Sequence, residues 1–428
     1  MAYSAVKGGQ EAVAESIRLL EKNRSTGQRD LDLESLEKGM ALLIDRIMGE
    51  AGFYAPAYAA LALKQSAGSP EEAVFLLRAY RSTLSRSYLS LPMDGADMRI
   101  RRRISAAFKD IPGGQFLGAT FDYTHRLLNF DLQDETRNTL TDESVLYPEK
   151  TAAGERPAGK ETAAREQTAP ENQSGPIRTH RVSDELRREG LIGAGGDDGD
   201  FRDLDPLDIT QEPLTFPAPR SSRLQTLARA DTGYISGLAY AAIRGFGSGH
   251  PTVGELRAGT LEVTIPHPLA EGEKLFVGDI AVTEVESLFP EEDRETKKEE
   301  KDDPLKLLSS GQGDKADTSV NILSLGTGYG MVFGRNDTKA IAMSILDYSL
   351  NIADSGSAEN HGGANTGGSN GNGGETSILE NQEFVLLHGD CLEMNGFISH
   401  LKLPHYVTFQ SKLDRVRYTQ KKADHDRL

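Results

Sequence analysis

The sequence predicts an α+β protein with a helical N-terminal domain, a polar linker and a mixed α/β C-terminal domain. Apolar residues recur at helical spacing in the first third of the chain, large apolar residues become scarce after residue 135, and apolar residues alternate along short runs beyond residue 260. We place the helical domain at residues 1–134, the largely flexible linker at 135–211 and the mixed domain at 212–428. A chain of 428 residues is long enough for two or three domains with a sizeable core.

Helical periodicity is clearest near the start of the sequence. Two apolar stripes have helical spacing: Val13, Ile17 and Leu20 in the first, and Leu36, Met40, Leu43, Ile44 and Ile47 in the second. We expect both stripes to face a core, and Gly49 and Gly52 to end the second helix. The run Ser69-Pro70-Glu71-Glu72 predicts another helix start, because a serine cap is followed by proline at the first helical position and glutamate at the third.

Alternation of apolar and polar residues indicates strands in the second half of the chain. The apolar residues of two strands alternate, Leu261, Val263 and Ile265 in the first and Ile280 and Val282 in the second. Glu284 and Glu286 continue the second strand, and we interpret them as a solvent-facing edge. Asp337 is expected to cap the helix that follows it. Polar insertions, predicted to be flexible, interrupt this domain near residues 290–318 and 354–378.

Composition and charge exclude several classes of protein. The single cysteine, Cys391, excludes a disulfide framework and an iron–sulfur cluster built from this chain alone. A net charge of −17 argues against general nucleic-acid binding, although a local cluster of cations can still bind a phosphate-rich small ligand. No apolar run reaches the length of a membrane span, and the first residues lack the features of a signal peptide, so a cytoplasmic protein is expected.

Arginines are concentrated in two places that suit an anionic ligand. Arg78 and Arg81 share one face of the helix that begins near Ser69, where they either contact a ligand or form a solvated surface. The run Arg99–Arg103 is the most basic part of the chain, and the glycine pair 113–114 follows it. Guanidinium groups make paired, charge-assisted hydrogen bonds with phosphate, and glycine allows a ligand close to the backbone. The alternative for this second segment is a turn beside a solvated basic helix end.

His400 and His405 stand five residues apart, with Pro404 directly before the second. Neither a regular helix nor a strand brings residues at this spacing to one side, so convergence of the two rings requires a turn near residues 402–404. Neutral imidazole is a common ligand of zinc, and two histidines would leave coordination positions for water, substrate or another chain. The alternative is a strand–turn–strand corner in which both rings are hydrogen-bonded.

Several long segments of the chain share one resemblance: Phe75–Arg81, Arg99–Arg126, Gly233–Tyr240, Gly326–Gly334, Glu383–Asp390 and Gly396–Gln410. Together they closely resemble the PhnI family, the I subunit of bacterial carbon–phosphorus lyase. The resemblance implies a subunit that displaces adenine from ATP with an alkylphosphonate, giving a ribose 1-phosphonate 5-triphosphate, and that acts as a purine nucleosidase when alone. It also implies partners, namely the G, H and J subunits with associated ATP-binding subunits, and two copies of this chain in the complex.

The resemblance also implies site residues. His400 and His405 match a pair of metal ligands that faces the radical-enzyme subunit, which implies a divalent metal, zinc favoured, shared with that partner. The 5′-triphosphate needs several cations, and the candidates are Arg78, Arg81, Arg101, Arg103, Arg220 and Arg223, with Arg244 in the same pool. Departing adenine needs a proton donor, and the positively charged transition state of the sugar needs a carboxylate. The candidates for these roles are Asp110, Asp122, His125, His388 and Asp390, together with Glu284.

A non-catalytic scaffold is the alternative function. Such a subunit would present the metal ligands to the radical lyase subunit and leave the nucleotide chemistry to a partner. The sequence lacks any known nucleotide-binding motif, which favours the scaffold, whereas the clustering of arginine, glycine and histidine in the PhnI-like segments favours the enzyme. Release of free adenine from ATP by the purified chain separates the two functions.

Overall fold

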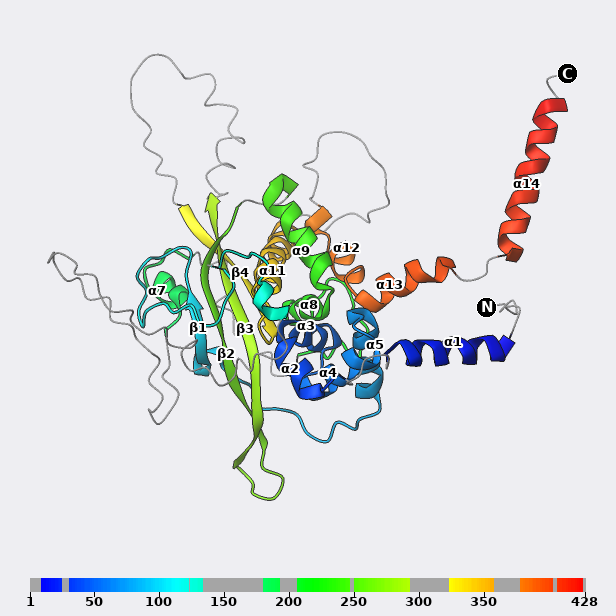
Figure 1. Ribbon diagram of the computed structural model, residues 1–428. Coiled ribbons are helices and arrows are strands. Elements are labelled where there is room, and N and C mark those ends of the chain that lie inside the picture. Colours follow the sequence, from blue (N-terminus) through cyan, green and yellow to red (C-terminus); the bar gives the residue numbers. More distant parts are fainter. Residues whose placement is uncertain are drawn as a thin grey trace, which may run out of the picture.

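A four-stranded antiparallel sheet forms the centre of the protein. The computed structural model describes residues 9–24, 31–122, 124–133, 180–192, 206–246, 250–292, 323–357, 378–402 and 406–425. The strands are β1 (Arg99–Ile104), β2 (Thr252–Pro266), β3 (Lys274–Glu292) and β4 (Leu323–Phe333). Each strand pairs with the next in the order β1-β2-β3-β4. Helices precede this sheet in the chain and pack beside it, which confirms the predicted α+β class (Figure 1).

The helices fall into an early and a late group. The early helices are α1 (Gly9–Arg24), α2 (Leu33–Gly39), α3 (Ala41–Ala51), α4 (Pro56–Gln65) and α5 (Pro70–Ser82). The later helices are α7 (Val182–Arg188), α8 (Arg220–Arg229), α9 (Thr232–Ala241), α11 (Asp337–Ser357), α12 (Gln382–Leu387), α13 (Cys391–Ser399) and α14 (Tyr406–His425). Short helical turns are η1 (Gly95–Asp97), η2 (Phe130–Gln133), η3 (Ala242–Phe246), η5 (Ile378–Glu380) and η6 (His400–Lys402). Within the described ranges, no helix combines the length and apolar character that a membrane crossing requires.

Helices α2 to α5 form a small core of their own. Ile44 and Ile47 of α3 are buried against apolar side chains of α4 and α5, as the stripe predicts, whereas Met40 of the same stripe is 52% exposed. The predicted single helix is divided at Met40, which ends α2 and precedes α3. The end of α3 at Gly52 follows from its left-handed backbone (φ 62°), a conformation that glycine adopts without strain. Helix α5 begins as predicted, because the Ser69 hydroxyl accepts a hydrogen bond from the backbone N of Glu72.

Helix α1 has an apolar face that no described part of the chain covers. Val13, Ile17 and Leu20 are 58%, 51% and 59% exposed, so the predicted burial of this stripe is wrong. The spacing correctly predicts the helix, but an amphipathic pattern does not say whether the covering surface belongs to the same chain. Figure 1 shows α1 extending away from the sheet and from α3.

Helix α11 packs directly on one face of the sheet. Gly328 and Gly330 of β4 face it, and a Cβ on either residue would lie 2.0 Å or 2.1 Å from a backbone oxygen of α11. The absence of side chains at these two glycines therefore brings helix and strand into close contact. Asn336, rather than the predicted Asp337, caps α11, because its side chain accepts from the backbone N of Lys339. Asp337 occupies the first turn instead.

The opposite face of the sheet carries buried charges beneath α7. Strand β3 lies between β2 and β4, so Glu284 cannot be an edge residue, and the interpretation of a solvent-facing edge is wrong. Its carboxylate pairs with Arg257 of β2 and with Arg181, where the Nη2–Oε1 distance is 2.9 Å. On the same face, Arg103 and Glu255 pair at 2.6 Å. Burying two opposite charges as a pair costs less free energy than burying either charge alone.

Segments from all three predicted domain ranges meet at the sheet. Strand β1 comes from the range 1–134 and pairs with β2, so the first and last ranges contribute to one sheet. Helix α7 lies inside the predicted linker 135–211 and packs on the sheet through Val182 and Leu186. Most of the predicted insertions near 290–318 and 354–378 lies outside the described residues.

The contact between α11 and β4 yields a stability prediction. Gly330→Ala should destabilise the protein by about 1–3 kcal/mol, because the added methyl group pushes α11 away from the sheet. Gly237→Ala is the matched control: this glycine lies within α9 with no atom near its Cβ position, so alanine should stabilise the helix by up to about 1 kcal/mol. Urea unfolding of the two variants measures both effects. Equal stability of the two variants would contradict the close packing.

Candidate functional site

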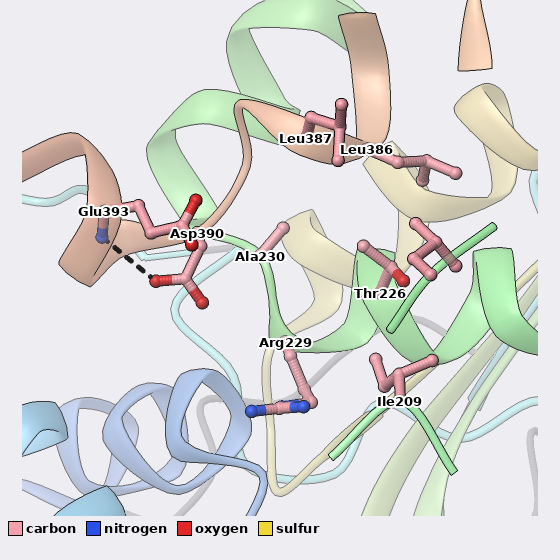
Figure 2. A pocket seen from close by; sticks show the side chains of 9 residues that line it. Ile209, Thr226, Arg229, Ala230, Leu386, Leu387, Asp390 and Glu393 are labelled. Carbon is pink, nitrogen blue, oxygen red and sulfur yellow. Dashed lines mark hydrogen bonds between the residues drawn. The ribbon is translucent and has the colours of Figure 1, made fainter. Parts of the chain in front are cut away.

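A pocket of about 230 Å³ opens between α8, α12 and α13, beside the core of α2 to α5. Its lining combines apolar, cationic and anionic residues: Ile209, Leu214, Thr226, Arg229, Ala230, Leu386, Leu387, Asp390 and Glu393. Figure 2 shows Arg229 and Asp390 on the same side of this pocket, with Leu386 and Leu387 along another wall. The pocket thus has a charged side and an apolar side, an arrangement typical of small-molecule sites.

Two turns position the charged side. Arg229 is the last residue of α8, and Asp390 is the N-cap of α13, where its carboxylate accepts from the backbone N of Leu392 at 2.9 Å and of Glu393 at 3.2 Å. The backbone N of Asp231 donates to the carbonyl of Gly389 at 2.8 Å. This hydrogen bond ties the turn after α8 to the turn before α13, and it fixes Arg229 relative to Asp390.

Two arginines of α5 reach the same region. Arg78 donates through Nη1 to Asp390 Oδ2 at 2.6 Å and through Nη2 to the carbonyl of Glu50 at 2.6 Å. Arg81 donates through Nη1 to the carbonyls of Ala51 and Gly52. These carbonyls belong to the C-terminal end of α3, where the helix dipole is negative and favours cations. The predicted pair Arg78 and Arg81 is therefore held beside the predicted Asp390.

Arg229 completes a cluster of three arginines. Burial, followed by the charges of Arg78 and Arg81, lowers the pKa of Arg229 to about 10. Its buried Nε has no hydrogen-bond partner among the described residues. Burial alone would raise the pKa of Asp390, but the charge and hydrogen bond of Arg78 outweigh it, so this pKa lies below its usual value and the carboxylate is ionised. With one direct carboxylate partner for three guanidinium groups, the cluster is suited to an anion with several oxygens.

Arg229 was not among the residues predicted from the sequence. It follows Arg220 by nine positions, which is half a turn away on a helix, so the two side chains leave α8 on opposite sides. The helical spacing alone predicts that Arg229 points away from Arg220. It does not predict that α5 lies next to Arg229, which requires the fold.

The two predicted arginines at the start of α8 serve another purpose. Arg220 pairs with Asp347 of α11, with an Nη2–Oδ2 distance of 2.7 Å, and Asp347 is fully buried. Arg223 donates to the side chain of Asn351, also on α11, at 2.6 Å. Both residues fasten α8 to α11, and neither lines the pocket.

The basic run Arg99–Arg103 forms strand β1, so the alternative of a basic helix end is wrong. Arg103 is fully buried and bonded to Glu255, whereas Arg101 is exposed. Asp122 pairs with Arg102.

The remaining catalytic candidates divide between two regions. Asp110 and His125 are exposed, and with Asp122 they lie outside the pocket lining. His388 stands two residues before Asp390, at the end of α12, where its Nδ1 is 2.9 Å from the carbonyl oxygen of Phe384. His388 is exposed and is also outside the pocket lining, so of these candidates the structure groups Asp390 with Arg78 and Arg81.

His400 lies in η6, directly after α13, so the strand–turn–strand alternative is wrong. Its Nδ1 hydrogen-bonds the carbonyl of Phe397, and the two rings are 5.1 Å apart. If this nitrogen carries the proton, Nε2 is the atom that would bind a metal, because a ligating histidine usually donates its other ring N–H to a carbonyl or carboxylate. His405 lies outside the described residues. In the described part of the chain, no group of three His, Cys, Asp or Glu residues could hold a metal by itself.

The arginine cluster predicts a link between anion binding and stability. Arg229→Met should leave the melting temperature of the ligand-free protein unchanged or higher, because the substitution removes a largely buried charge and its repulsion from Arg78 and Arg81. The same substitution should remove most of the thermal stabilisation that tripolyphosphate gives to the wild-type protein. Thermal unfolding with and without tripolyphosphate measures both effects, with the exposed Arg188→Met as the control. Undiminished stabilisation of Arg229→Met would exclude Arg229 from the anion site.

Comparison with known proteins places the chain in a family. Residues 2–423 match the family described as bacterial phosphonate metabolism protein (PhnI). The α-D-ribose 1-methylphosphonate 5-triphosphate synthase subunit PhnI of Escherichia coli (strain K12) is 37% identical over 426 residues, covering 99% of both chains. The subunit of the same name from Rhizobium meliloti (strain 1021) is 37% identical over 428 residues, covering 99% of this chain and 96% of the relative.

A third relative extends the likeness. HtxH of Stutzerimonas stutzeri, which is named as a candidate C-P lyase subunit, is 39% identical over 430 residues, covering 99% of this chain and 97% of its own. Identity at this level along nearly the full length of all three relatives is sufficient to assign a family. The chain belongs to the PhnI family of bacterial phosphonate metabolism proteins.

Proposed function

We propose that this chain is the nucleotide-binding, catalytic subunit of an α-D-ribose 1-methylphosphonate 5-triphosphate synthase, acting in phosphonate breakdown by carbon–phosphorus lyase. Two relatives that match the chain along almost its whole length carry the name of a subunit of this synthase. In this proposal the chain works in the cytoplasm, in a complex with G, H and J subunits and associated ATP-binding subunits, and each complex contains two copies of it.

The observation that carries the proposal is the cluster of three arginines at the charged side of the pocket. Arg229 lines the pocket, Arg78 and Arg81 lie beside it, and Asp390 is the carboxylate that pairs directly with Arg78, while Glu393 is also part of the lining. Burial, and then the charges of Arg78 and Arg81, lower the pKa of Arg229. A triphosphate supplies several anionic oxygens that can accept charge-assisted hydrogen bonds from these guanidinium groups. The pocket, at about 230 Å³, is smaller than the about 300–1,000 Å³ of typical ligand sites, so it suits the triphosphate end of ATP rather than the whole nucleotide.

The reaction exchanges one bond at the anomeric carbon of the ribose. A phosphonate oxygen forms the new bond to this carbon, and the bond to the adenine nitrogen breaks with its electron pair. We assign His388 as the donor of the proton that adenine needs, and Asp390 as the carboxylate that stabilises the positive charge developing on the sugar. Arg78 orients Asp390 and keeps it ionised. When water takes the place of the phosphonate, the same chemistry is that of a purine nucleosidase.

A metal site is the second part of the proposal. His400, with Nδ1 bonded to a backbone carbonyl, fits a metal ligand that binds through Nε2. We propose that His400 and His405 bind a divalent metal, zinc favoured, together with groups from the radical-enzyme subunit. The metal would hold the two subunits in register, and the adenine-releasing step requires no metal at this position.

The alternative function, a non-catalytic scaffold, has one observation in its favour. The apolar faces of α1 and of the segment from α13 to η6 are exposed, with Phe397, Ile398 and Leu401 each at least 65% exposed. Exposed apolar faces of this kind suit contacts with partner subunits. Such contacts are equally compatible with a catalytic subunit, so the assay for adenine separates the two functions.

Adenine release tests the proposed function. The purified chain should release adenine from ATP, and Arg78→Gln should raise the KM for ATP by about tenfold while changing the KM for adenosine much less, since only ATP carries the triphosphate. Arg188→Gln, an exposed arginine of α7, is the matched control and should leave both values unchanged. Chromatography of the released base measures the rates. A chain that releases no adenine, alone or with its partner subunits, would favour the scaffold.

Metal content tests the second part. His400→Ala and His405→Ala should each remove metal from the assembled complex, while adenine release by the isolated chain continues. Elemental analysis of the purified complexes gives the metal content. Full metal occupancy in both single variants would exclude these histidines as ligands.

A further inference from the structure

A lysine on α11 lies directly behind the arginine pocket. Lys339 is 1% exposed, and its Nζ donates to the carbonyl of Ala230 at 2.8 Å. Ala230 lines the pocket and follows Arg229 in the chain. A Cβ at Gly49 would lie 3.9 Å from the same Nζ, so the ammonium group also lies near the C-terminal end of α3.

Charged or titratable groups from three other elements face Lys339. Glu50 and Arg46 come from α3, Asp231 from the turn between α8 and α9, and Cys391 from the start of α13. Arg46 pairs with Glu50 at 2.8 Å and with Asp231 at 3.0 Å, which leaves the ammonium group of Lys339 to balance the second carboxylate. Glu50 Oε2 is buried and has no hydrogen-bond partner among the described residues. Lys339 is therefore the remaining cation of a buried, otherwise unbalanced cluster.

This cluster reaches the pocket arginines by two routes. One route runs from Lys339 Nζ to the carbonyl of Ala230, whose neighbour is Arg229. The other runs through Glu50, whose backbone carbonyl accepts two hydrogen bonds from Arg78, the partner of Asp390. Both routes end on guanidinium groups that we assign to the triphosphate.

We propose that Lys339 is a positioning residue for the anion pocket, holding the Ala230 and Glu50 segments so that Arg229 and Arg78 face the ligand together. The inference extends the proposed function, because it takes the pocket as the triphosphate site. Replacing Lys339 alone leaves a buried carboxylate without its cation, so a loss of stability does not by itself test the positioning role, and anion affinity does. Lys339 itself does not line the pocket and touches no ligand there.

The positioning effect depends on the charge of Lys339 and hence on pH. Burial lowers the pKa of Lys339 to about 8, although Glu50 and Asp231 oppose the shift. Above this pH the neutral amine of Lys339 no longer balances the carboxylates, so the Ala230 and Glu50 segments are held together less firmly. The folded-state pKa lies below that of an unfolded lysine. The contribution of Lys339 to the free energy of unfolding therefore rises as the pH increases from about 8 to about 10.5. Over the same range the affinity of the pocket for an anion should fall.

The test compares tripolyphosphate affinity of the wild-type protein, Lys339→Met and Lys339→Gln by calorimetry at pH 7 and pH 9. The variants should bind about tenfold more weakly than wild type at pH 7 and about equally at pH 9, since a lost charge-assisted hydrogen bond is worth roughly this factor. Because variants and wild type are compared at the same pH, the charge of tripolyphosphate is the same in each comparison. Lys274→Met, an exposed lysine at the start of β3, is the control and should match wild type.

Each outcome decides one of the two claims. Wild-type affinity in both variants at pH 7 overturns the role of Lys339 and leaves the anion pocket standing. A wild-type protein that binds no tripolyphosphate overturns the pocket and the role of Lys339 together. If neither variant folds, sulfate binding to the wild-type protein decides, because the charge of sulfate is constant over this range. A fall of several-fold from pH 7 to pH 9 supports the proposal, and unchanged affinity overturns it.

Discussion

The close packing of α11 on β4 is the constraint on which the rest of the structure depends. Gly328 and Gly330 leave no side chain between helix and strand, so α11 lies at backbone distance from the sheet. From that position α11 holds its neighbours through polar side chains. Asp347 binds Arg220 of α8, and Lys339 binds the carbonyl of Ala230 just after α8. Because α8 ends at Arg229, the packing of α11 on β4 determines where Arg229 lies in the pocket.

The described ion pairs distinguish structural arginines from the arginines of the pocket. On the sheet, Arg103 pairs with the buried Glu255, and Arg257 shares the buried Glu284 with Arg181, so carboxylates of the sheet itself occupy these guanidinium groups. At the pocket, burial and then the charges of Arg78 and Arg81 lower the pKa of Arg229, and Asp390 is the carboxylate that pairs directly with Arg78. Like charges held together in this way destabilise the ligand-free protein, and an anion relieves the repulsion. Balance of charge, rather than the number of arginines in a segment, therefore indicates the candidate site.

Local features were predictable from the sequence, and features that depend on partners across the fold were not. The cap at Ser69 and the alternation around Leu261 gave correct elements, since both patterns depend on neighbouring residues alone. Arg78 and Asp390 were predicted as site residues, but their contact joins positions 312 apart and needed the structure. Glu284 was misread because its polar character suits an edge, whereas its burial depends on arginines of other strands and loops. Arg229 was missed for the same reason: nothing near it in the sequence shows that α5 lies beside it.

A crystal structure of the protein with bound ATP, or with the triphosphate product left after adenine release, tests the central claim most directly. We expect the phosphate groups between Arg78, Arg81 and Arg229, with Asp390 and His388 on the side of the ribose. The guanidinium groups should keep their present positions, because backbone carbonyls of α3 already hold Arg78 and Arg81. Phosphate density at the exposed Arg101 of β1, with an empty arginine pocket, would contradict the account.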